Sequence, residues 1–477
     1  MNNNDPSVRM ITIQVPSFMQ EAIENIVRMT RETPTFNTAE SFEKREQQIY
    51  QFTNKLSDTI VEHQLQMVCD SESMRQAGRK LADALPGRVK NQGLRDVRIQ
   101  TLHGGTITIT TPYFSRNCDE QKSNRGCYPV LMLLGIHGYR PHVTPALSNY
   151  IVLMVAAMGS MEEAKVWLDK QGITWSVNGI RTLTYHYTTR ARYAQQDYAA
   201  CLGESIAGRR IVVSVDGGRL RVRRNKRGPK TKKGRHHYHT NWREPKLLII
   251  YVLDEKGNMD HSWTPIIDGL LMHDGQAPDA IFELIRYYLS NLDIDQADRV
   301  MFVADGARWI WLRVASLFSS LGLRDGQVIE LVDFYHAVEH LSKVADLRRG
   351  WTKPQRRKWI RKQRKRLLKG DVDRVITAVD ELCKGRLSDK IRTERDYFHN
   401  NIGRMNYKQV KQEKLPMGSG AMESAVRRVI NLRLKGAGIF WHEDNANAML
   451  MLRSYYKAGR TQDIARFAFT TPMRVAA

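Results

Sequence analysis

Three apolar segments of the sequence each end in an aspartate, and these aspartates are the residues best suited to do chemistry. Residues 211–216 read IVVSVD, residues 300–305 read VMFVAD, and residues 328–333 read VIELVD. Short apolar runs rich in β-branched residues predict strands buried on both faces. A carboxylate at the end of such a strand is costly to bury unless a cation pairs with it. We therefore expect the three aspartates to gather at one edge of a sheet, where they could hold Mg²⁺ or Mn²⁺.

A further acid, Glu423, follows much later, in the segment GSGAMES. Gly418 and Gly420 free the preceding loop, and Ser419 can cap a helix that begins there. Glu423 then lies in about the first turn, where the helix dipole favours a carboxylate. Arg427 comes one turn later, so it can pair with Glu423 or with a DNA phosphate.

Strands, helices and acids in this order predict an α/β RNase H-like core, a mixed five-stranded sheet flanked by helices. The predicted fold adds a long basic helical stretch before the helix of Glu423 and a mainly helical N-terminal region with a β-hairpin and a helix-turn-helix. The expected domains are residues 1–90 (helical arm), 91–143 (β-hairpin module), 144–200 (helix-turn-helix), 205–345 (first part of the core), 346–414 (basic helical insertion) and 415–477 (C-terminal core helices).

The charge of the chain points to a polyanionic partner. Its 477 residues include 74 Lys and Arg against 50 Asp and Glu, a net charge of +24. A surface this basic repels itself unless a polyanion neutralises it, so nucleic acid is the expected partner. The five cysteines do not form a disulfide pattern and fit a reducing cytosol. The N-terminus lacks an apolar leader, and the longest apolar run, 150–158, is too short to span a bilayer. We therefore expect a soluble, cytoplasmic, nucleoid-associated protein with no membrane role.

Two segments concentrate this charge, each with ten Lys or Arg and no acid. Residues 219–235 contain Gly228-Pro229 and predict two strand ends joined by a basic loop. Residues 352–369 have too few apolar residues for a wide buried face, which predicts a helix lying along phosphates. The predicted DNA-contacting residues are Arg181, Arg221, Arg223, Arg224, Lys226, Arg227, Lys232, Lys233, Arg356, Arg357, Arg361, Lys362, Arg364, Lys365, Arg428, Arg433, Lys435 and Trp441, with Trp441 able to stack on a flipped base.

The N-terminal third leaves several alternatives open. Residues 38–85 predict a helical pair that is either a solvated cover or an arm for dimerisation or DNA ends. Alternation over residues 95–111, with His-Gly-Gly at 103–105, predicts a hairpin. Cys118 and Cys127, with Asp119 and His137 nearby, have the wrong spacing for a zinc ribbon, so zinc is not expected and two ordinary thiols are favoured. Residues 160–193 predict a helix, a glycine turn and a helix with polar residues around Arg181, either a DNA-binding helix-turn-helix or a plain helical hairpin.

Four blocks carry a family resemblance: DGGRLR, ADGARWIW, DFYHAVEHL and GSGAMESAVRRVINLRLKGAGIFW occur in this order. They resemble blocks of bacterial insertion-sequence transposases of the DDE type, and the match covers residues 211–452, about half of the chain. The resemblance implies a triad of Asp216, Asp305 and Glu423 holding two Mg²⁺ or Mn²⁺ ions, with Asp216 bridging both. It also implies a helical insertion before the helix bearing Glu423, cleavage at the element ends and strand transfer into target DNA. Binding of the terminal inverted repeats is expected from the charge and the predicted helix-turn-helix. Two ends that must be joined imply a homodimer or higher oligomer on DNA.

Some assignments within these blocks remain open. Asp333 could replace Asp305 or Glu423 as a ligand, or, with His336, form a D-x-x-H element that positions DNA, or simply cap a helix. Trp309 and Trp311 are core residues or a base-stacking platform. At the level of function, the alternatives are a catalytically silent DNA-binding protein derived from a transposase and an RNase H-like nuclease acting on branched DNA or hybrids.

Overall fold

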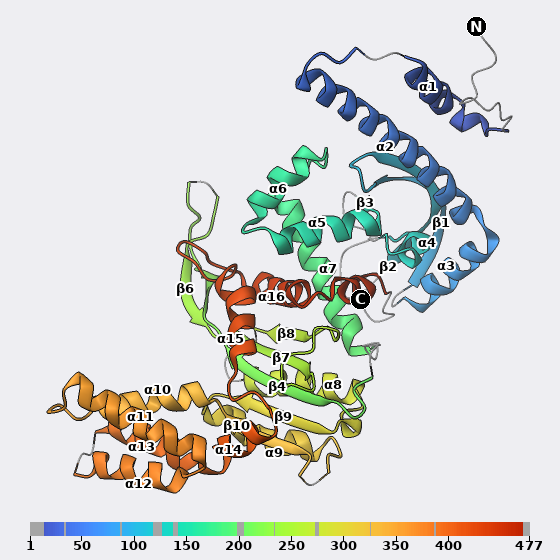
Figure 1. Ribbon diagram of the computed structural model, residues 1–477. Coiled ribbons are helices and arrows are strands. Elements are labelled where there is room, and N and C mark those ends of the chain that lie inside the picture. The colour runs from blue at the N-terminus through green and yellow to red at the C-terminus, as the bar shows by residue number, and fades with distance from the viewer. Residues whose placement is uncertain are drawn as a thin grey trace, which may run out of the picture. The chain divides into compact units, whose positions relative to one another are not determined.

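The computed structural model describes residues 14–32, 35–85, 88–117, 126–136, 142–197, 205–232, 234–271, 276–324, 326–385 and 388–470. The chain forms two compact units (Figure 1): one comprises Met1–Val152, Lys165–Leu183 and Phe469–Ala477, and the other Leu153–Ala164 and Thr184–Ala468. The division runs through α5 (Pro145–Ala157), α6 (Met161–Lys170) and α7 (Val177–Asp197), so the region predicted as a helix-turn-helix domain is shared between the two units.

The first unit combines helices with a three-stranded sheet of order β2-β1-β3. Its elements are η1 (Ser17–Met19), α1 (Gln20–Arg31), α2 (Ala39–Asp70), α3 (Glu72–Ala84), β1 (Arg88–Gln100), β2 (Thr106–Asn117), α4 (Pro129–Leu133) and β3 (His142–Val143). The predicted hairpin is confirmed, because β1 and β2 pair antiparallel and Gly104 takes a φ of 83° at the turn. Helix α2 packs on β2 over a core that includes Ile99, Ile107 and Ile109. Cys118, Asp119 and His137 lie outside the described residues.

The second unit is built on a mixed five-stranded sheet of order β10-β9-β4-β7-β8, as predicted. The strands are β4 (Arg210–Gly217), β7 (Lys246–Leu253), β8 (Ile266–Leu270), β9 (Arg299–Ala304) and β10 (Val328–Val332). Strand β7 runs antiparallel to β4 and β8, while β4, β9 and β10 are parallel. All eight residues of β7 are buried, which explains its unbroken apolar sequence. Because β4, β9 and β10 are parallel, the three segments ending in aspartate finish at one edge of the sheet.

A basic hairpin and two helices interrupt the succession of sheet strands. The hairpin consists of β5 (Leu220–Asn225) and β6 (Tyr238–Arg243) and extends as a narrow ribbon in Figure 1. Helices α8 (Ala277–Asn291), with the short η2 (Ile294–Gln296), and α9 (Arg308–Ser319) connect the later strands. Parallel strands need such crossovers, because a tight turn cannot join them.

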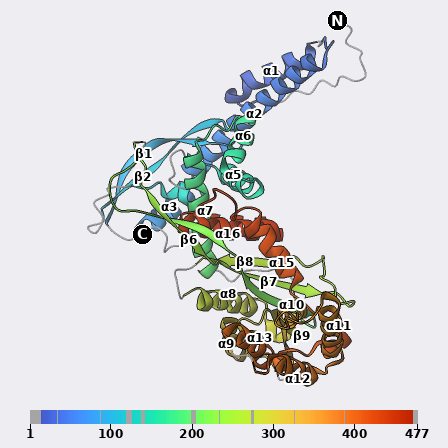
Figure 2. The ribbon, with the colours of Figure 1, turned by 90° about the vertical axis from the view of Figure 1, so that its left-hand side faces the viewer.

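A run of helices follows β10, and all but its first helix falls within the predicted insertion, residues 346–414. Its helices are α10 (Phe334–Asp346), α11 (Lys353–Lys369), α12 (Val372–Cys383), α13 (Asp389–Asn400), η3 (Ile402–Arg404) and α14 (Tyr407–Gln412). Helices α10 to α13 pack on one another and form one bundle in both views (Figures 1 and 2). The chain then continues through α15 (Gly420–Val426), the π-helical turn η4 (Arg427–Asn431), α16 (Glu443–Ala458) and α17 (Thr461–Phe469). None of the helices in the described ranges has the length and apolar character required to cross a bilayer.

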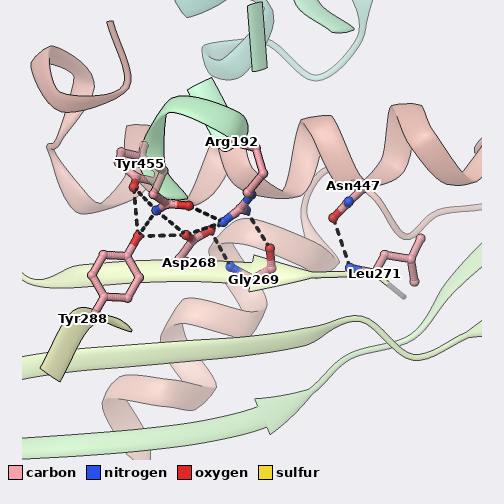
Figure 3. A network of polar contacts seen from close by, with 8 residues as sticks. Arg192, Asp268, Gly269, Leu271, Tyr288, Asn447 and Tyr455 are labelled. Carbon is pink, nitrogen blue, oxygen red and sulfur yellow. Dashed lines mark hydrogen bonds and ion pairs between the residues drawn. The ribbon is translucent and has the colours of Figure 1, made fainter. Parts of the chain in front are cut away.

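A buried carboxylate ties three helices to the edge strand β8 (Figure 3). The Asp268 side chain is fully buried, and its two oxygens accept hydrogen bonds of 2.8 Å from the guanidinium of Arg192 on α7. The hydroxyl of Tyr288 on α8 also donates to Asp268, at 2.8 Å, and the side-chain amide of Gln195 donates at 3.1 Å. Tyr455 on α16 completes the network through the hydroxyl of Tyr288. Because every member is hydrogen-bonded, the buried charge is compensated.

Candidate active site

Asp216 and Asp305 lie beside each other at the ends of the parallel strands β4 and β9. The backbone N–H of Gly217 donates to Asp216 Oδ1 at 2.6 Å, and the N–H of Ala307 donates to Asp305 Oδ1 at 2.9 Å. Burial raises the pKa of Asp216 to about 6, and the negative charge of Asp305 adds to the rise. Two neighbouring carboxylates in a partly buried position repel each other when both are ionised, and a divalent cation between them would remove that repulsion.

A lysine that sequence reasoning missed lies next to this pair. Lys246 opens β7 opposite Gly217, and the residue is only 6% exposed. Its ammonium group binds Glu244 and lies 4.1 Å from the ring centre of Trp309. Its positive charge lowers the pKa of Asp216, against the larger effect of burial. The site therefore already contains one fixed cation. A lysine at the head of the otherwise apolar segment KLLIIYVL is the signal that could have revealed it.

The glycines after the two aspartates leave room that other side chains fill. A Cβ at Gly217 would lie 2.3 Å from Glu244 Oε1, and a Cβ at Gly306 would lie 2.2 Å from Tyr397 Cε2. Both distances are shorter than van der Waals contact allows, so a larger residue at either position would displace a neighbour of the acidic pair. The close approach of Tyr397 also shows that the insertion helix α13 reaches the end of β9.

Trp311 and Trp309 contact residues of the acidic site. Trp311 is buried, and its indole N–H donates to the backbone carbonyl of Asp305 at 2.7 Å. Trp309 is half-buried, and its ring packs edge-on against Phe282 and carries Lys246 on its face. Trp311 is therefore a core residue. One face of the Trp309 ring is covered by Lys246, so that face is not open for stacking on a base.

Asp333 is used as a helix cap and as a tether. The residue is 2% exposed, and its Oδ1 accepts hydrogen bonds from the backbone N–H groups of Tyr335 and His336 at 2.6 and 2.9 Å. Its Oδ2 accepts from the backbone N–H and the hydroxyl of Ser419 at 2.5 and 2.6 Å. Of the open alternatives for Asp333, the cap is the one observed. The same carboxylate fixes the loop that leads into the helix bearing Glu423.

Replacement of Asp333 by alanine is expected to destabilise the protein by about 2–4 kcal/mol, because it removes a helix cap and two further hydrogen bonds to a buried charge. We also expect it to lower any activity that depends on Glu423, since the loop at Ser419 loses its anchor. Chemical denaturation followed by circular dichroism measures the first effect. Glu339→Ala is the control, because Glu339 lies on the same helix with a side chain 67% exposed. Equal stability of the two variants would contradict the assigned role.

Glu423 lies where the sequence predicts, in the first turn of α15, and is exposed. Its backbone N–H donates to the carbonyl of Ser419 at 2.9 Å, and α15 packs against β4 and β7. Across the described ranges, no set of three or more His, Cys, Asp or Glu side chains is arranged to hold a metal ion. The structure thus brings Asp216 and Asp305 together and puts Glu423 on a helix that packs against their sheet, without joining it to the pair. Arg427, also exposed, opens the π-helical turn that follows α15.

The insertion contributes a histidine pair and a tyrosine near the acidic edge. His340 on α10 is buried, lies 2.6 Å from Glu394 on α13 and stacks on Tyr397 with ring centres 3.6 Å apart. Burial lowers the pKa of His340, against the opposing effect of Glu394. Burial, together with charges that include Asp305, raises the pKa of Tyr397, whose hydroxyl has no hydrogen-bond partner within the described part of the chain. His336 is more exposed than His340, and its Nδ1 lies 3.6 Å from Glu339 Oε2.

The predicted DNA-contacting residues separate into exposed and buried groups. Most are exposed on the β5–β6 hairpin, on α11 or at the C-terminal block: Arg223, Arg224, Lys226, Arg227, Lys232, Arg357, Arg361, Lys362, Arg364, Lys365 and Lys435. Arg181, Arg221, Arg356 and Arg428 are half-buried. Lys233 lies outside the described residues.

Trp441 and Arg433, two of the residues predicted to contact DNA, are buried. Trp441 is 8% exposed, and its indole N–H donates to the carbonyl of Leu434 at 3.0 Å. Arg433 is 5% exposed, with its guanidinium 5.3 Å from the ring centre of Trp441. The two side chains pack on each other beneath the surface, because the backbone of Trp441 pairs with β5 and carries its ring inward.

Comparison of the chain with protein-family models, with curated proteins and with solved structures finds no match.

Proposed function

We propose that this protein is a DDE transposase, which binds the terminal inverted repeats of an insertion sequence, cleaves DNA at its ends and joins them to target DNA. The observation that carries the proposal is the neighbouring pair of carboxylates, Asp216 and Asp305, at the ends of two adjacent parallel strands. The strand order supports an RNase H-like core, since an antiparallel meander of β4, β7 and β8 is extended by two parallel strands. The four sequence blocks all contribute residues to this one edge or its supports.

The residues present fit a divalent metal, because carboxylate oxygens are the donors that Mg²⁺ and Mn²⁺ prefer and because Asp216 and Asp305 repel each other without one. Asp216, Asp305 and Glu423 would hold the metal, and bound metal would supply activation of the attacking hydroxyl and charge stabilisation at the leaving 3′-oxygen. Glu423 lies on α15, which packs against β4 and β7, and a loop leads into this helix at Ser419. Asp333 holds that loop at Ser419.

Basic residues outside the triad position DNA around this edge of the sheet. Exposed cations of α11, such as Arg357 and Arg361, offer contacts to phosphates along one helix, and the basic β5–β6 hairpin offers a second set. Lys246, buried beside Asp216, keeps a positive charge where negative charge accumulates as a phosphodiester approaches. No side chain has to act as a nucleophile in this proposal.

The direct test is cleavage of DNA from the two flanks of the reading frame. We expect strand-specific nicks at imperfect inverted repeats in the presence of Mg²⁺ or Mn²⁺, no nicks in EDTA, and none on the same DNA with shuffled ends. End-specific binding without metal-dependent nicking would instead favour a catalytically silent DNA-binding protein. Cleavage of branched DNA or hybrids with no preference for these ends would favour a nuclease.

A further inference from the structure

The β5–β6 hairpin separates its side chains into an anchored face and an open face. Leu220 and Val222 are fully buried, which sets the inward side of β5. Arg224 and Arg243 both bind Glu443 at the start of α16, at 2.9 and 3.3 Å. The hairpin is also paired to the C-terminal segment, because the N–H of Arg223 donates to the carbonyl of Trp441 at 2.8 Å. The base of the ribbon is therefore fixed to its own unit.

The open face of the ribbon combines aromatic rings with arginines. Arg221 pairs across the ladder with Trp242, and Asn225 pairs with Tyr238, so these side chains lie on one face with Arg223. Trp242 is 56% exposed and Tyr238 is 42% exposed, which is unusual for rings of this size. We define the aromatic face by Arg221, Arg223, Tyr238 and Trp242, together with the neighbouring Phe440.

The arginines hold these rings in place. The guanidinium of Arg221 lies 4.6 Å from the ring centre of Phe440 and 5.5 Å from that of Trp242. Arg221 is itself fixed by a 2.6 Å hydrogen bond to the carbonyl of Gly436. Arg223 lies 5.9 Å from the ring centre of Tyr238, and the rings of Tyr238 and Phe440 are 5.8 Å apart. Cation–π contacts of this kind order exposed rings before a ligand arrives.

The charge around the aromatic face selects one kind of ligand. From Gly217 to Arg243 the sequence contains no Asp or Glu, and the loop between the strands adds Lys226, Arg227, Lys230 and Lys232. A ligand for this face must offer both negative charge and flat apolar surfaces. Unpaired nucleotides do so, because each has a phosphate and a base with two π-faces, whereas paired bases in a duplex conceal their faces.

We propose that the aromatic face binds unpaired bases of a single DNA strand, with Trp242 and Tyr238 as stacking platforms and the arginines on the flanking phosphates. The proposal deepens the proposed function, because DNA opened at an element end is the natural source of such a strand. The binding itself needs neither metal nor cleavage. It is therefore tested separately from the chemistry at Asp216 and Asp305.

The test measures fluorescence anisotropy of the full-length protein in EDTA, with a labelled 20-nucleotide single strand, the same length of abasic backbone, and the matched duplex. We expect Trp242→Ala to weaken single-strand binding about tenfold or more, with duplex and abasic binding changed less than about twofold. Tyr238→Ala should act in the same direction, and Trp242→Phe should restore most of the affinity. Trp167→Ala is the matched control, because Trp167 on α6 is 48% exposed and has Lys170 4.6 Å from its ring centre.

Single-strand affinity that is unchanged in both Trp242→Ala and Tyr238→Ala would overturn the proposal, and the face would then serve a protein partner or none. Equal weakening for single strand, abasic backbone and duplex would also overturn it, since the ribbon would then bind phosphates alone. Melting curves of each variant establish that the protein is folded, and Trp242→Phe tests the face without removing an aromatic ring. Failure of end cleavage with normal single-strand binding would contradict only the transposase proposal.

Discussion

Asp216→Asn is expected to abolish metal-dependent cleavage while making the protein more stable. The amide keeps the shape of the side chain and its oxygen can still accept the N–H of Gly217, but it removes the charge that a metal ion needs. A loss of about 10³-fold corresponds to roughly 4 kcal/mol of transition-state stabilisation. End cleavage under single-turnover conditions measures it. Retained cleavage by this variant would end the transposase proposal.

The expected gain in stability of Asp216→Asn follows from the direction of the pKa shift. In the folded state the pKa of Asp216 is raised from 3.8 to about 6, so ionisation costs the folded state more than the unfolded state. The native protein therefore loses part of its stability, the contribution of Asp216, as the pH rises from about 4 to about 6, and Asn escapes this loss. We expect a gain of about 2–3 kcal/mol above pH 6 in EDTA, because the pKa rises from 3.8 to about 6 and one pKa unit corresponds to about 1.4 kcal/mol.

Addition of Mg²⁺ or Mn²⁺ is expected to narrow or reverse this difference in stability. Binding to the folded state alone raises stability by mass action, so we expect a higher melting temperature for the native protein and little change for Asp216→Asn. Ca²⁺ in place of Mg²⁺ is the control for a metal that binds carboxylates without matching the geometry of the smaller ions. If none of the three ions changed the melting temperature of the native protein, the assignment of Asp216 and Asp305 as ligands would be contradicted.

Asp268→Ala is expected to cost about 3–5 kcal/mol, the largest stability effect in the second unit, because it leaves the guanidinium of Arg192 without its partner. The alanine also removes the acceptor for Tyr288 and Gln195 in a site closed to water. Urea denaturation should show a lower midpoint with a similar slope, or a separate early transition if α7 detaches from β8.

Glu283→Ala provides the matched control for Asp268→Ala. Glu283 binds Arg286 on α8, and both side chains are more than half exposed. Exposed pairs of this kind contribute little, so we expect a change below about 0.5 kcal/mol. If the two variants were equally stable, the network of Figure 3 would not be what holds α7, α8 and α16 to β8.

The edge of the sheet was predictable from the sequence because buried parallel strands leave a strong pattern. The three segments are almost entirely apolar before their aspartates, with Ser214 and Glu330 as the exceptions, so the strand ends follow from composition. The helix start near Glu423 was predictable for a similar local reason, since glycines and Ser419 mark it. Lys246 was missed because a lysine at the head of a strand is usually solvated, and its burial depends on Trp309 from a distant segment.

Contacts made by the insertion and the hairpin could not be predicted in the same way. Tyr397 reaches Gly306 through the packing of α13 on α10, which no local pattern records. The burial of Trp441 could not be predicted, because a tryptophan among basic residues gives no indication of which side of a strand pair its ring occupies. Trp242 is exposed because side chains alternate along a strand, and Trp242 lies on the face of the hairpin opposite to the buried Leu220 and Val222.

The packing of Phe334 makes the insertion inseparable from the strand it follows. Phe334 is almost fully buried, and its ring centre lies 5.1 Å from that of Tyr407 on α14. Its backbone N–H donates to the carbonyl of Met417 at 3.0 Å. A shortened protein with residues 346–414 excised would lose Tyr407 and therefore expose an aromatic hydrophobic surface at the tip of β10. Such a minimal core is expected to aggregate. Insertions and deletions should instead be tolerated in the turns of the bundle that lie away from this aromatic contact.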